Sequence, residues 1–226
     1  MDWFKKYDEI AAELDLSRAS DRAATILLDN LIEDSSVERL SVLLEDKRVI
    51  VFGAGPSLGD AVSYVKEKSL HDRYVFVVAD GAVSAFLEAE VLPDVLVTDL
   101  DGRLRDILEA NLRGSLTVVH AHGDNIALLE NVVPRLSGVV GSTQVKPVGR
   151  VHNFGGFTDG DRCVFLAVYF KAREILLAGM DFDSDVGKYS RSSDSERKRK
   201  KLLIAKNLIE ELTEETDIPI KALDIT

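Results

Sequence analysis

The sequence predicts an α/β protein with a doubly wound, mostly parallel sheet and several helices before the sheet begins. From Lys47 onward, short and almost wholly apolar runs alternate with amphipathic helical patterns. Strands that are buried on both faces have such continuous apolar runs, and alternation with helices is typical of parallel sheets. At 226 residues, the chain is long enough for one large domain. We expect an N-terminal helical segment, 1–46, packed on an α/β domain, 47–226.

The elements of this fold can be placed in order along the chain. Before Asp46, apolar residues recur at helical spacing, which predicts two or three helices. The runs that we expect to form strands are 49–52, 74–78, 95–97, 117–120, 139–140, 174–178 and 220–223. The segments that we expect to form helices after them are 58–68, 83–90, 104–112, 126–136, 162–170 and 198–215. This order predicts parallel strands joined by crossover helices.

The composition limits the kinds of partner. The net charge is −11, whereas broad binding to nucleic acid or anionic membranes requires a basic surface. The single Cys163 excludes an intramolecular disulfide, which fits a reducing compartment. No apolar run approaches the length of a membrane span or of a signal peptide core. We therefore expect a cytoplasmic protein without nucleic-acid or membrane partners.

A glycine-rich turn follows the first expected strand. Gly53 and Gly55 allow the backbone to approach a phosphate closely, and Ser57 stands where the next helix begins. The match to the dinucleotide fingerprint is imperfect, because the third glycine, Gly59, comes one position late, and a Walker lysine is absent. We predict that Gly53, Gly55 and Ser57 bind a phosphate or nucleotide; a tight turn between strand and helix is the alternative.

Aspartates follow three of the expected strands. Asp80 follows the second, Asp99 and Asp101 follow the third, and Asp181 follows the strand at 174–178. Ligands of open parallel sheets bind at the carboxyl ends of the strands, so Asp80, Asp99 and Asp101 should face one crevice as catalytic residues. In an extended stretch, Asp99 and Asp101 would share a face and could hold Mg²⁺, with Asp181 as a third ligand. Helix capping is the alternative, and it is strongest for Asp181.

Two further segments offer groups for an organic substrate. One is the end of the fourth expected strand, where two histidines flank an alanine, and the other is the glycine-rich stretch 151–162. Amide, hydroxyl and carboxylate groups can bind the edge of a flat heterocycle, and an aromatic ring can stack on its face. The candidate substrate ligands are His120, His122, Asn153, Phe157, Thr158 and Asp159. A long loop that leads into the next helix is the alternative for the second segment.

A polar, highly charged segment covers residues 183–201. It is either a solvated loop that runs into a helix or a lid that closes on phosphates, since loops of this length in compact domains are often functional. Lys188 and Lys198 are our candidate phosphate ligands in this segment, and Arg191 and Lys201 could reach the same groups.

With these motifs in view, the chain resembles two related families. The pair Ala79-Asp80-Gly81-Ala82 and Thr98-Asp99-Leu100-Asp101 is similar to the aspartates that follow adjacent strands in thiamin pyrophosphokinases. Glycine stands at position 102, where the thiamin enzymes carry serine. The overall arrangement more closely resembles the archaeal 6-hydroxymethyl-7,8-dihydropterin diphosphokinase family. The segments that carry this resemblance are the glycine turn, the double aspartate, 153–162 and 178–182.

The resemblance implies an activity, 2-amino-4-hydroxy-6-hydroxymethyldihydropteridine diphosphokinase, and a fold like the thiamin pyrophosphokinase catalytic domain. ATP and 6-hydroxymethyl-7,8-dihydropterin would be the substrates, Mg²⁺ the cofactor, and AMP and the pterin diphosphate the products. The reaction would serve the synthesis of methanopterin or folate-type cofactors.

Other functions stay open at this point. Thiamin is an alternative acceptor. An NAD(P)-dependent oxidoreductase would place the glycine turn on the pyrophosphate and Asp80 on the ribose, but it would leave Asp99 and Asp101 without a role. A nucleotide-binding or glycosylation-accessory protein without catalysis is a third alternative. The sequence also leaves open a homodimer through the N-terminal helices, the number of metal ions and the proton acceptor.

Overall fold

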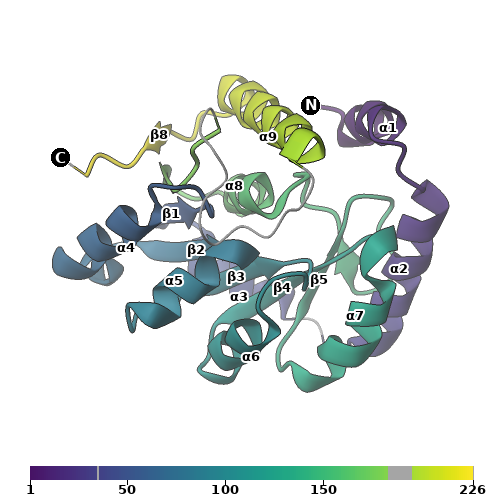
Figure 1. The fold of residues 1–226 in the computed structure, drawn as a ribbon, viewed down its shortest axis with the longest axis horizontal. Helices are drawn as coiled ribbons and strands as arrows, with labels where there is room; N and C mark the ends of the chain where they lie inside the picture. The colour runs from purple at the N-terminus through teal and green to yellow at the C-terminus, as the bar shows by residue number, and fades with distance from the viewer. Residues whose placement is uncertain (35, 183–194, 226) are drawn as a thin grey trace.

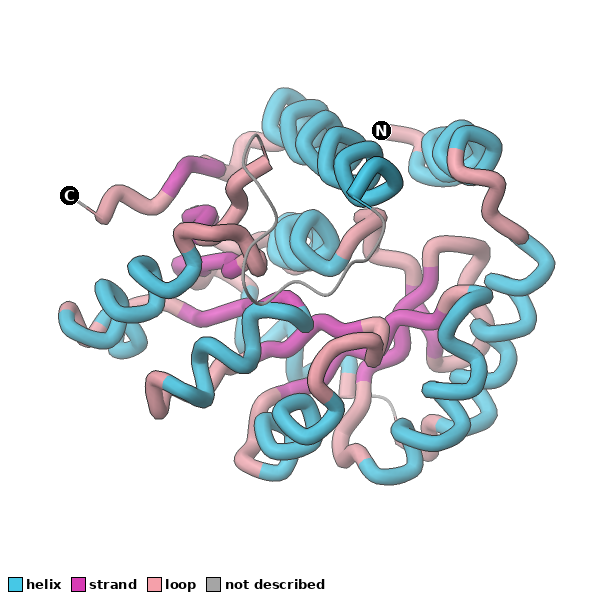
Figure 2. Tube along the Cα trace, in the orientation of Figure 1, coloured by secondary structure: helices cyan, strands magenta, loops and turns pink. Residues whose placement is uncertain are grey.

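A parallel sheet forms the centre of the protein. The computed structural model describes residues 1–34, 36–182 and 195–225. Within these residues the sheet has eight strands in the order β6-β5-β4-β3-β2-β1-β7-β8, and each neighbouring pair is parallel. The strands are β1 (Arg48–Phe52), β2 (Val75–Ala79), β3 (Val95–Thr98), β4 (Leu116–Ala121), β5 (Val140–Thr143), β6 (Val151–His152), β7 (Glu174–Ala178) and β8 (Ile220–Ala222). Figure 2 shows them as the central layer, which confirms the predicted fold class.

Helices cover both faces of this sheet. They are α1 (Trp3–Glu13), α2 (Arg18–Leu31), α3 (Val37–Leu44), α4 (Leu58–Glu67), α5 (Val83–Glu88), α6 (Leu104–Leu112), α7 (Ile126–Val132), α8 (Asp159–Tyr169) and α9 (Ser195–Glu215). In Figure 1, α1, α8 and α9 lie above the sheet, and α4, α5 and α6 lie below it. The two layers follow from the alternation of side chains along each strand. In β1, Val49 and Val51 pack in the cluster that contains α8 and α9, whereas Ile50 and Phe52 pack with α4.

The strand order places a crevice at the carboxyl ends of β1 and β7. Strands β1 to β6 follow one another outward from β1, and β7 then returns to the other side of β1. The order therefore reverses between β1 and β7, and ligands of open α/β sheets bind at such a switch point. The loops after β1, β2, β3 and β4 open on the same end of the sheet, because all these strands run in one direction.

The N-terminal helices are part of both core layers. Tyr7 and Ile10 of α1 and Leu40 of α3 lie in the cluster with Val49 and α8. Leu28 of α2 instead packs in the cluster of α6 and α7 on the other face. At the start of α2, Asp21 accepts a hydrogen bond from the Gly123 amide in the loop after β4, so the N-terminal segment reaches the same end of the sheet as the strand loops.

The structure differs from the sequence predictions at a few boundaries. The two-residue strand β6 was not predicted, because its residues lie in the glycine-rich stretch that reads as a loop. Helix α8 begins at Asp159, earlier than expected, since Thr158 and Asp161 cap each other reciprocally at its start. The predicted helix at 126–136 changes to a 3₁₀ turn at Val133–Arg135, where Pro134 removes a backbone donor.

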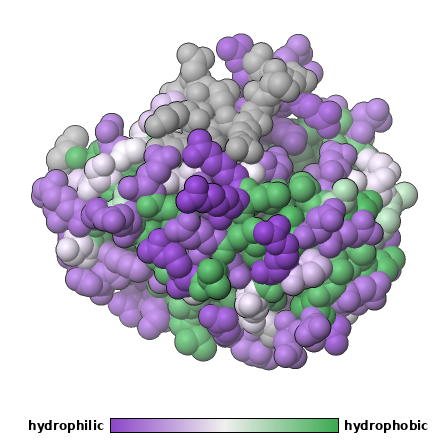
Figure 3. Space-filling model, turned by 60° about the horizontal axis from the view of Figure 1, so that its bottom comes forward, coloured by the Kyte–Doolittle hydropathy of each residue, from purple (hydrophilic) through white to green (hydrophobic). Residues whose placement is uncertain are grey.

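The surface below the sheet is mixed in character. Apolar and polar residues are interspersed on the face that comes forward in the space-filling view (Figure 3). Among the described residues, no helix has the length and apolar composition needed to cross a membrane.

Candidate active site

A cavity of about 580 Å³ lies at the carboxyl ends of the strands. This volume falls within the range of roughly 300–1,000 Å³ that is usual for small-molecule sites. Its walls come from the loops after β1, β2, β3, β4 and β7, from the first turn of α8, from α9 and from the junction of α1 and α2. The predicted residues that line it are Gly53, Gly55, Asp80, Asp99, Asp101, His120, His122, Phe157, Thr158, Asp159, Asp181, Lys198 and Lys201. Asp80, Asp99 and Asp101 therefore line one cavity, and their catalytic role stays a prediction.

Three carboxylates form the centre of the site. One oxygen each of Asp80, Asp99 and Asp159 lies within 4.8 Å of the other two. Asp80 follows β2 and Asp99 follows β3, whereas Asp159 approaches from the start of α8, above the sheet. We call these three residues the carboxylate triad. An arrangement of this kind, on three separate elements, is suited to a hard divalent cation.

The hydrogen bonds of Asp80 also fit a cation. Its Oδ2 accepts hydrogen bonds from the Thr98 hydroxyl at 2.5 Å and from the Gly102 amide at 3.2 Å. Its Oδ1 is buried and has no hydrogen-bond partner among the described residues. A buried acceptor that stays unpaired costs about 1–3 kcal/mol, and more for a charged group. A metal ion beside the triad would remove this cost.

The charges of the triad act strongly on one another. Burial raises the pKa of Asp80 to about 7, and the neighbouring Asp99 and Asp101 add to this shift. Burial also raises the pKa of Asp159 well above its usual value, again with a contribution from Asp99. Burial opposes ionisation of Asp99 as well, but the hydrogen bond and charge of His122 outweigh it and lower the pKa of this carboxyl. Asp99 is thus the member of the triad that is most firmly held as an anion.

Asp101 lies beside the triad and not within it. We expected an extended backbone between Asp99 and Asp101, and this is wrong at Leu100, whose φ is 70°, although the two carboxyls still lie in contact. The chain turns there, and the Asp101 amide donates to Asp99 Oδ1 at 3.2 Å. Gly102 then passes so close to Asp80 that a Cβ atom would come within 1.8 Å of Asp80 Oδ1. A side chain at position 102 would displace the Asp80 carboxylate from its observed place, so glycine suits this arrangement.

The glycine turn after β1 has protein partners for its amides. The Gly53 amide donates to the Ala178 carbonyl at 2.9 Å, and the Gly55 amide donates to the Gly179 carbonyl at 2.8 Å. The glycine turn after β1 is therefore joined to the turn after β7, which contains Gly179. Their contact leaves no room for side chains, since a Cβ at Gly55 would lie 2.7 Å from the Gly179 oxygen. The phosphate-binding role of Gly53 and Gly55 stays a prediction, and the observed bonds favour a structural role.

Asp181 has a partner other than the triad. Its carboxylate accepts hydrogen bonds from the amide and the hydroxyl of Ser57, each at 2.8 Å. It thereby caps the start of α4, at the place where we expected Ser57 to bind a phosphate. Asp181 lines the cavity but does not belong to the group of carboxylates that could share one ion. The capping alternative for this residue agrees with the structure.

The two histidines after β4 differ in environment. His122 Nε2 lies 3.2 Å from Asp99 Oδ2, so it orients the Asp99 carboxyl and favours its ionised form. His120 is buried between Ser142 at 2.9 Å and Gln144 at 3.3 Å. Burial lowers the pKa of His120 well below its usual value, so this ring is neutral. The structure brings both histidines to the cavity, as predicted.

The segment before α8 divides between the cavity and the fold. Phe157 and Thr158 line the cavity, but Asn153 is not among its lining residues. The Asn153 amide donates to the Val145 carbonyl at 3.0 Å, and its side-chain oxygen accepts from the Gly155 amide at 2.9 Å. Asn153 therefore stabilises the loop, and the structure does not place it where a substrate would bind.

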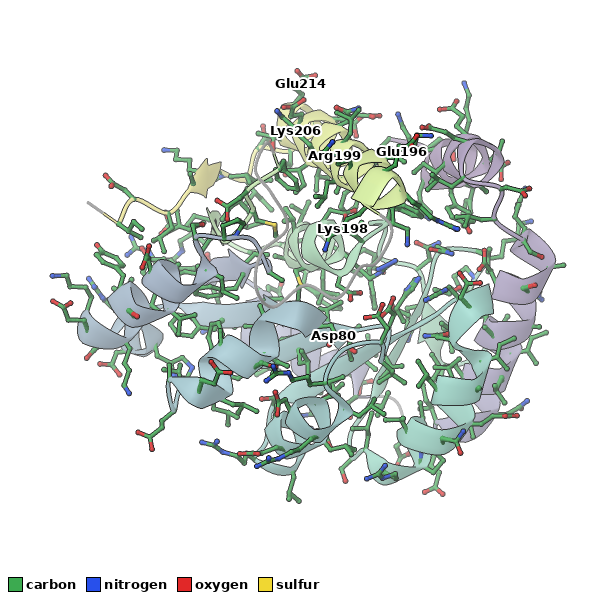
Figure 4. All side chains as sticks on the ribbon, viewed as in Figure 1. Asp80, Glu196, Lys198, Arg199, Lys206 and Glu214 are labelled. Atoms are coloured by element: carbon green, nitrogen blue, oxygen red, sulfur yellow. The ribbon has the colours of Figure 1, made fainter. Side chains whose placement is uncertain are left out.

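Basic residues of α9 approach the cavity from above. In Figure 4, Lys198 lies on the side of α9 that faces Asp80, whereas Glu214 points away from the sheet. Burial lowers the pKa of Lys198, and the charge of Asp101 partly opposes this effect. Lys201 Nζ lies 5.9 Å from the centre of the Phe157 ring. Lys188 and Arg191, which we also considered, lie outside the described residues.

Sequence reasoning missed an arginine at the centre of the site. Arg162, in the first turn of α8, is buried and lines the cavity. Its Nη1 lies 3.5 Å from Asp159 Oδ1, and its Nη2 donates to the Phe157 carbonyl at 3.0 Å. Its Nε is buried without a partner among the described residues. The signal was the spacing Asp159 to Arg162, which places both side chains on one side of a helix.

Comparisons with known proteins agree with this architecture. The chain is 41% identical to a 6-hydroxymethyl-7,8-dihydropterin pyrophosphokinase of Methanocaldococcus jannaschii, covering 96% of this chain and 97% of the relative. Proteins of the same name from Methanothermobacter thermautotrophicus and Pyrococcus furiosus are 43% and 45% identical, covering 97% and 92% of this chain and the same shares of the relatives.

A solved structure is similar in fold. It is the MAf glycosyltransferase from Magnetospirillum magneticum AMB-1, with a TM-score of 0.52 and 14% identity, covering 88% of this chain and 38% of that one. At this identity the similarity concerns the fold alone. Residues 22–187 also match the family model described as "6-hydroxymethylpterin diphosphokinase MptE-like". The family match covers most of the chain, and together with the relatives it shows that this protein belongs to the 6-hydroxymethylpterin diphosphokinase MptE-like family.

Proposed function

We propose that this chain transfers a diphosphate group from ATP to the hydroxymethyl group of 6-hydroxymethyl-7,8-dihydropterin. The products are AMP and the pterin diphosphate, which serves methanopterin or folate-type cofactor synthesis. We infer the acceptor from the names of three relatives, each a 6-hydroxymethyl-7,8-dihydropterin pyrophosphokinase. The observation that carries the proposal for this chain is the carboxylate triad, with the unpartnered Oδ1 of Asp80 beside a cavity of substrate size.

The triad is the proposed site of Mg²⁺. Asp80, Asp99 and Asp159 supply carboxylate oxygens, the ligands that this ion prefers. This set differs from our first choice of Asp99, Asp101 and Asp181, because Asp80, Asp99 and Asp159 form the group of described carboxylates whose oxygens all lie close enough to share one ion. A bound Mg²⁺ would hold phosphate oxygens of ATP and offset their negative charge.

Cationic side chains of the cavity bind the phosphates. Arg162 projects its guanidinium beside Asp159, and Lys198 and Lys201 approach from α9. Arginine offers several N–H donors in a rigid plane, which suits the oxygens of a phosphate that is being transferred. The triphosphate then lies between the acidic strand ends and the basic helices, and its β-phosphorus is held near the triad.

The chain positions the two substrates for a direct displacement. The hydroxymethyl oxygen of the acceptor attacks the β-phosphorus of ATP. The bond from this phosphorus to the oxygen that bridges to the α-phosphorus breaks, and AMP departs with that oxygen and its electron pair. The hydroxyl proton passes to a carboxylate at the cavity, for which we propose Asp101, because it lines the cavity beside the triad. Positioning and charge stabilisation supply most of the rate enhancement.

Formation of AMP tests the proposal. Purified protein is incubated with ATP and 6-hydroxymethyl-7,8-dihydropterin, with ATP and thiamin, and with ATP alone, each with Mg²⁺ or with EDTA. We expect AMP only with the pterin and Mg²⁺. AMP with thiamin alone would keep the mechanism and change the acceptor. If neither acceptor raises AMP above the sample with ATP alone, the proposed function is wrong.

A further inference from the structure

The cavity extends far beyond the carboxylate triad, toward the N-terminal helices. The glycine turns lie at β1 and β7, the triad lies over β2 and β3, and the far wall lies over β4 and β5. Neighbouring strands are about 4.8 Å apart, so β1 and β4 are separated by roughly 14 Å. The site therefore has room for two ligands, with the triad between them.

Asp21 forms part of the far wall. This residue lies in the first turn of α2, its side chain is 3% exposed, and it lines the cavity. Its Oδ1 accepts a hydrogen bond from the Gly123 amide at 2.8 Å, and its Oδ2 accepts one from the Tyr7 hydroxyl. No Lys, Arg or His side chain forms an ion pair with it among the described residues.

A buried carboxylate without a cation is costly, because removing its charge from water is only partly offset by two neutral donors. Each carboxylate oxygen can accept two hydrogen bonds, so Asp21 has acceptor capacity left. A ligand with two adjacent N–H donors would satisfy it. The edge of a 2-amino-4-oxo-pyrimidine ring has this pattern, with a ring N–H beside an amino group.

Asp21 and the triad line the same cavity and are linked through the turn that follows β4. Asp21 is bonded to the amide of Gly123, and the preceding residue, His122, is bonded to Asp99. One short turn therefore connects the two carboxylates. A ligand with its amino–oxo edge on Asp21 would direct an arm at its opposite end toward Asp99 and Asp101.

We infer that Asp21 recognises the amino–oxo pyrimidine edge of the acceptor, so that the N-terminal helices select the substrate. This inference rests on the proposed function and adds the residue that would distinguish a pterin from other acceptors. The nucleotide then occupies the side of the cavity near β1 and β7. Gln144, which donates to the Tyr7 hydroxyl at 2.8 Å, holds the wall around Asp21.

Three variants separate recognition from structure. Asp21→Asn keeps the shape and an acceptor oxygen but removes the charge and replaces the other acceptor with a donor. Tyr7→Phe removes the structural hydrogen bond and leaves the carboxylate in place. Asp8→Asn removes a charge from the exposed surface of α1, where Asp8 pairs with Arg18. Each is assayed for pterin-dependent AMP formation, for the KM of ATP and for pterin binding by calorimetry.

We expect Asp21→Asn to lower kcat/KM for the pterin by about 10- to 100-fold, the loss typical of a hydrogen bond to a charged group. The KM of ATP should stay within about twofold, and Asp8→Asn should match the wild type. An analogue of the pterin with a 2-oxo group in place of the 2-amino group should react more slowly than the pterin in the wild type, because its oxygen faces a carboxylate oxygen. In Asp21→Asn this difference should disappear, because the asparagine amide can donate a hydrogen bond to the 2-oxo group.

The outcomes separate this inference from the proposed function. If Tyr7→Phe and Asp21→Asn lower pterin binding and kcat/KM equally, Asp21 only ties α1 to α2, and the inference is overturned. The same holds if Asp21→Asn binds the pterin as the wild type does. If the wild type binds the pterin through Asp21 but forms no AMP, the proposed function is wrong and the recognition stands. If the wild type does not bind the pterin, both are wrong.

Discussion

Asp99→Asn is expected to reduce kcat by about 10³-fold or more while the protein stays folded. Asp99 contributes the carboxylate that is most firmly ionised in the triad, and His122 holds it in place at 3.2 Å. Asparagine keeps the shape and one acceptor oxygen but removes the charge, so the loss falls on the binding of Mg²⁺, the ion that would offset the charge of the phosphates. The measurement is the initial rate of pterin-dependent AMP formation at saturating ATP and Mg²⁺.

A second measurement, the melting temperature with and without Mg²⁺, checks the assignment of Asp99 as a ligand of this ion. Mg²⁺ should raise the melting temperature of the wild type by binding the folded state, and this increase should disappear in Asp99→Asn. Asp60→Asn, an exposed carboxylate on α4, is the matched control and should keep both the activity and the shift. Full activity of Asp99→Asn would exclude this residue from the active site.

Arg162→Lys is expected to lower kcat by about 10²- to 10³-fold, although the charge is retained. Lysine cannot reproduce the planar set of donors of the guanidinium. In Arg162 this group donates to the Phe157 carbonyl, lies beside Asp159 and has a buried Nε without a partner among the described residues. The effect should fall on kcat more than on the KM of the pterin, because a transferring phosphate gains charge contacts in the transition state. Steady-state kinetics in both substrates provide the separation.

Asp161→Asn is the structural control for this arginine. Asp161 caps α8 with hydrogen bonds from the amides of Phe157 and Thr158, and it does not line the cavity. Its substitution should lower the melting temperature while kcat stays within about tenfold. If Arg162→Lys only lowers stability and leaves kcat intact, Arg162 acts as a structural partner of Phe157.

Part of the site follows from the sequence because topology alone places it. Asp80 and Asp99 follow adjacent parallel strands, so any doubly wound sheet brings them to one edge. The periodicity of apolar residues is enough to locate those strands. The backbone around Asp101 could not be predicted in this way. The positive φ of Leu100 ends the extended course of the chain, and a leucine gives no indication of such a conformation in the sequence.

The remaining parts depend on contacts between distant segments. Asp159 belongs to the triad because α8 crosses back above the sheet to β7, and its place beside Asp80 cannot be read from local spacing. Asp181 meets Ser57 only because β7 returns to β1. Asp21 lies in a helix whose apolar pattern indicates a structural role, and its approach to Gly123 depends on the packing of α2 against the β4 loop.

The products of one reaction test the central claim most directly. The protein is incubated with ATP, Mg²⁺ and 6-hydroxymethyl-7,8-dihydropterin, and the phosphorus-containing products are quantified by ³¹P NMR. Attack on the β-phosphorus predicts AMP and pterin diphosphate in equal amounts, with no ADP. Formation of ADP with a pterin monophosphate, or of AMP with free diphosphate and unchanged pterin, would contradict the account.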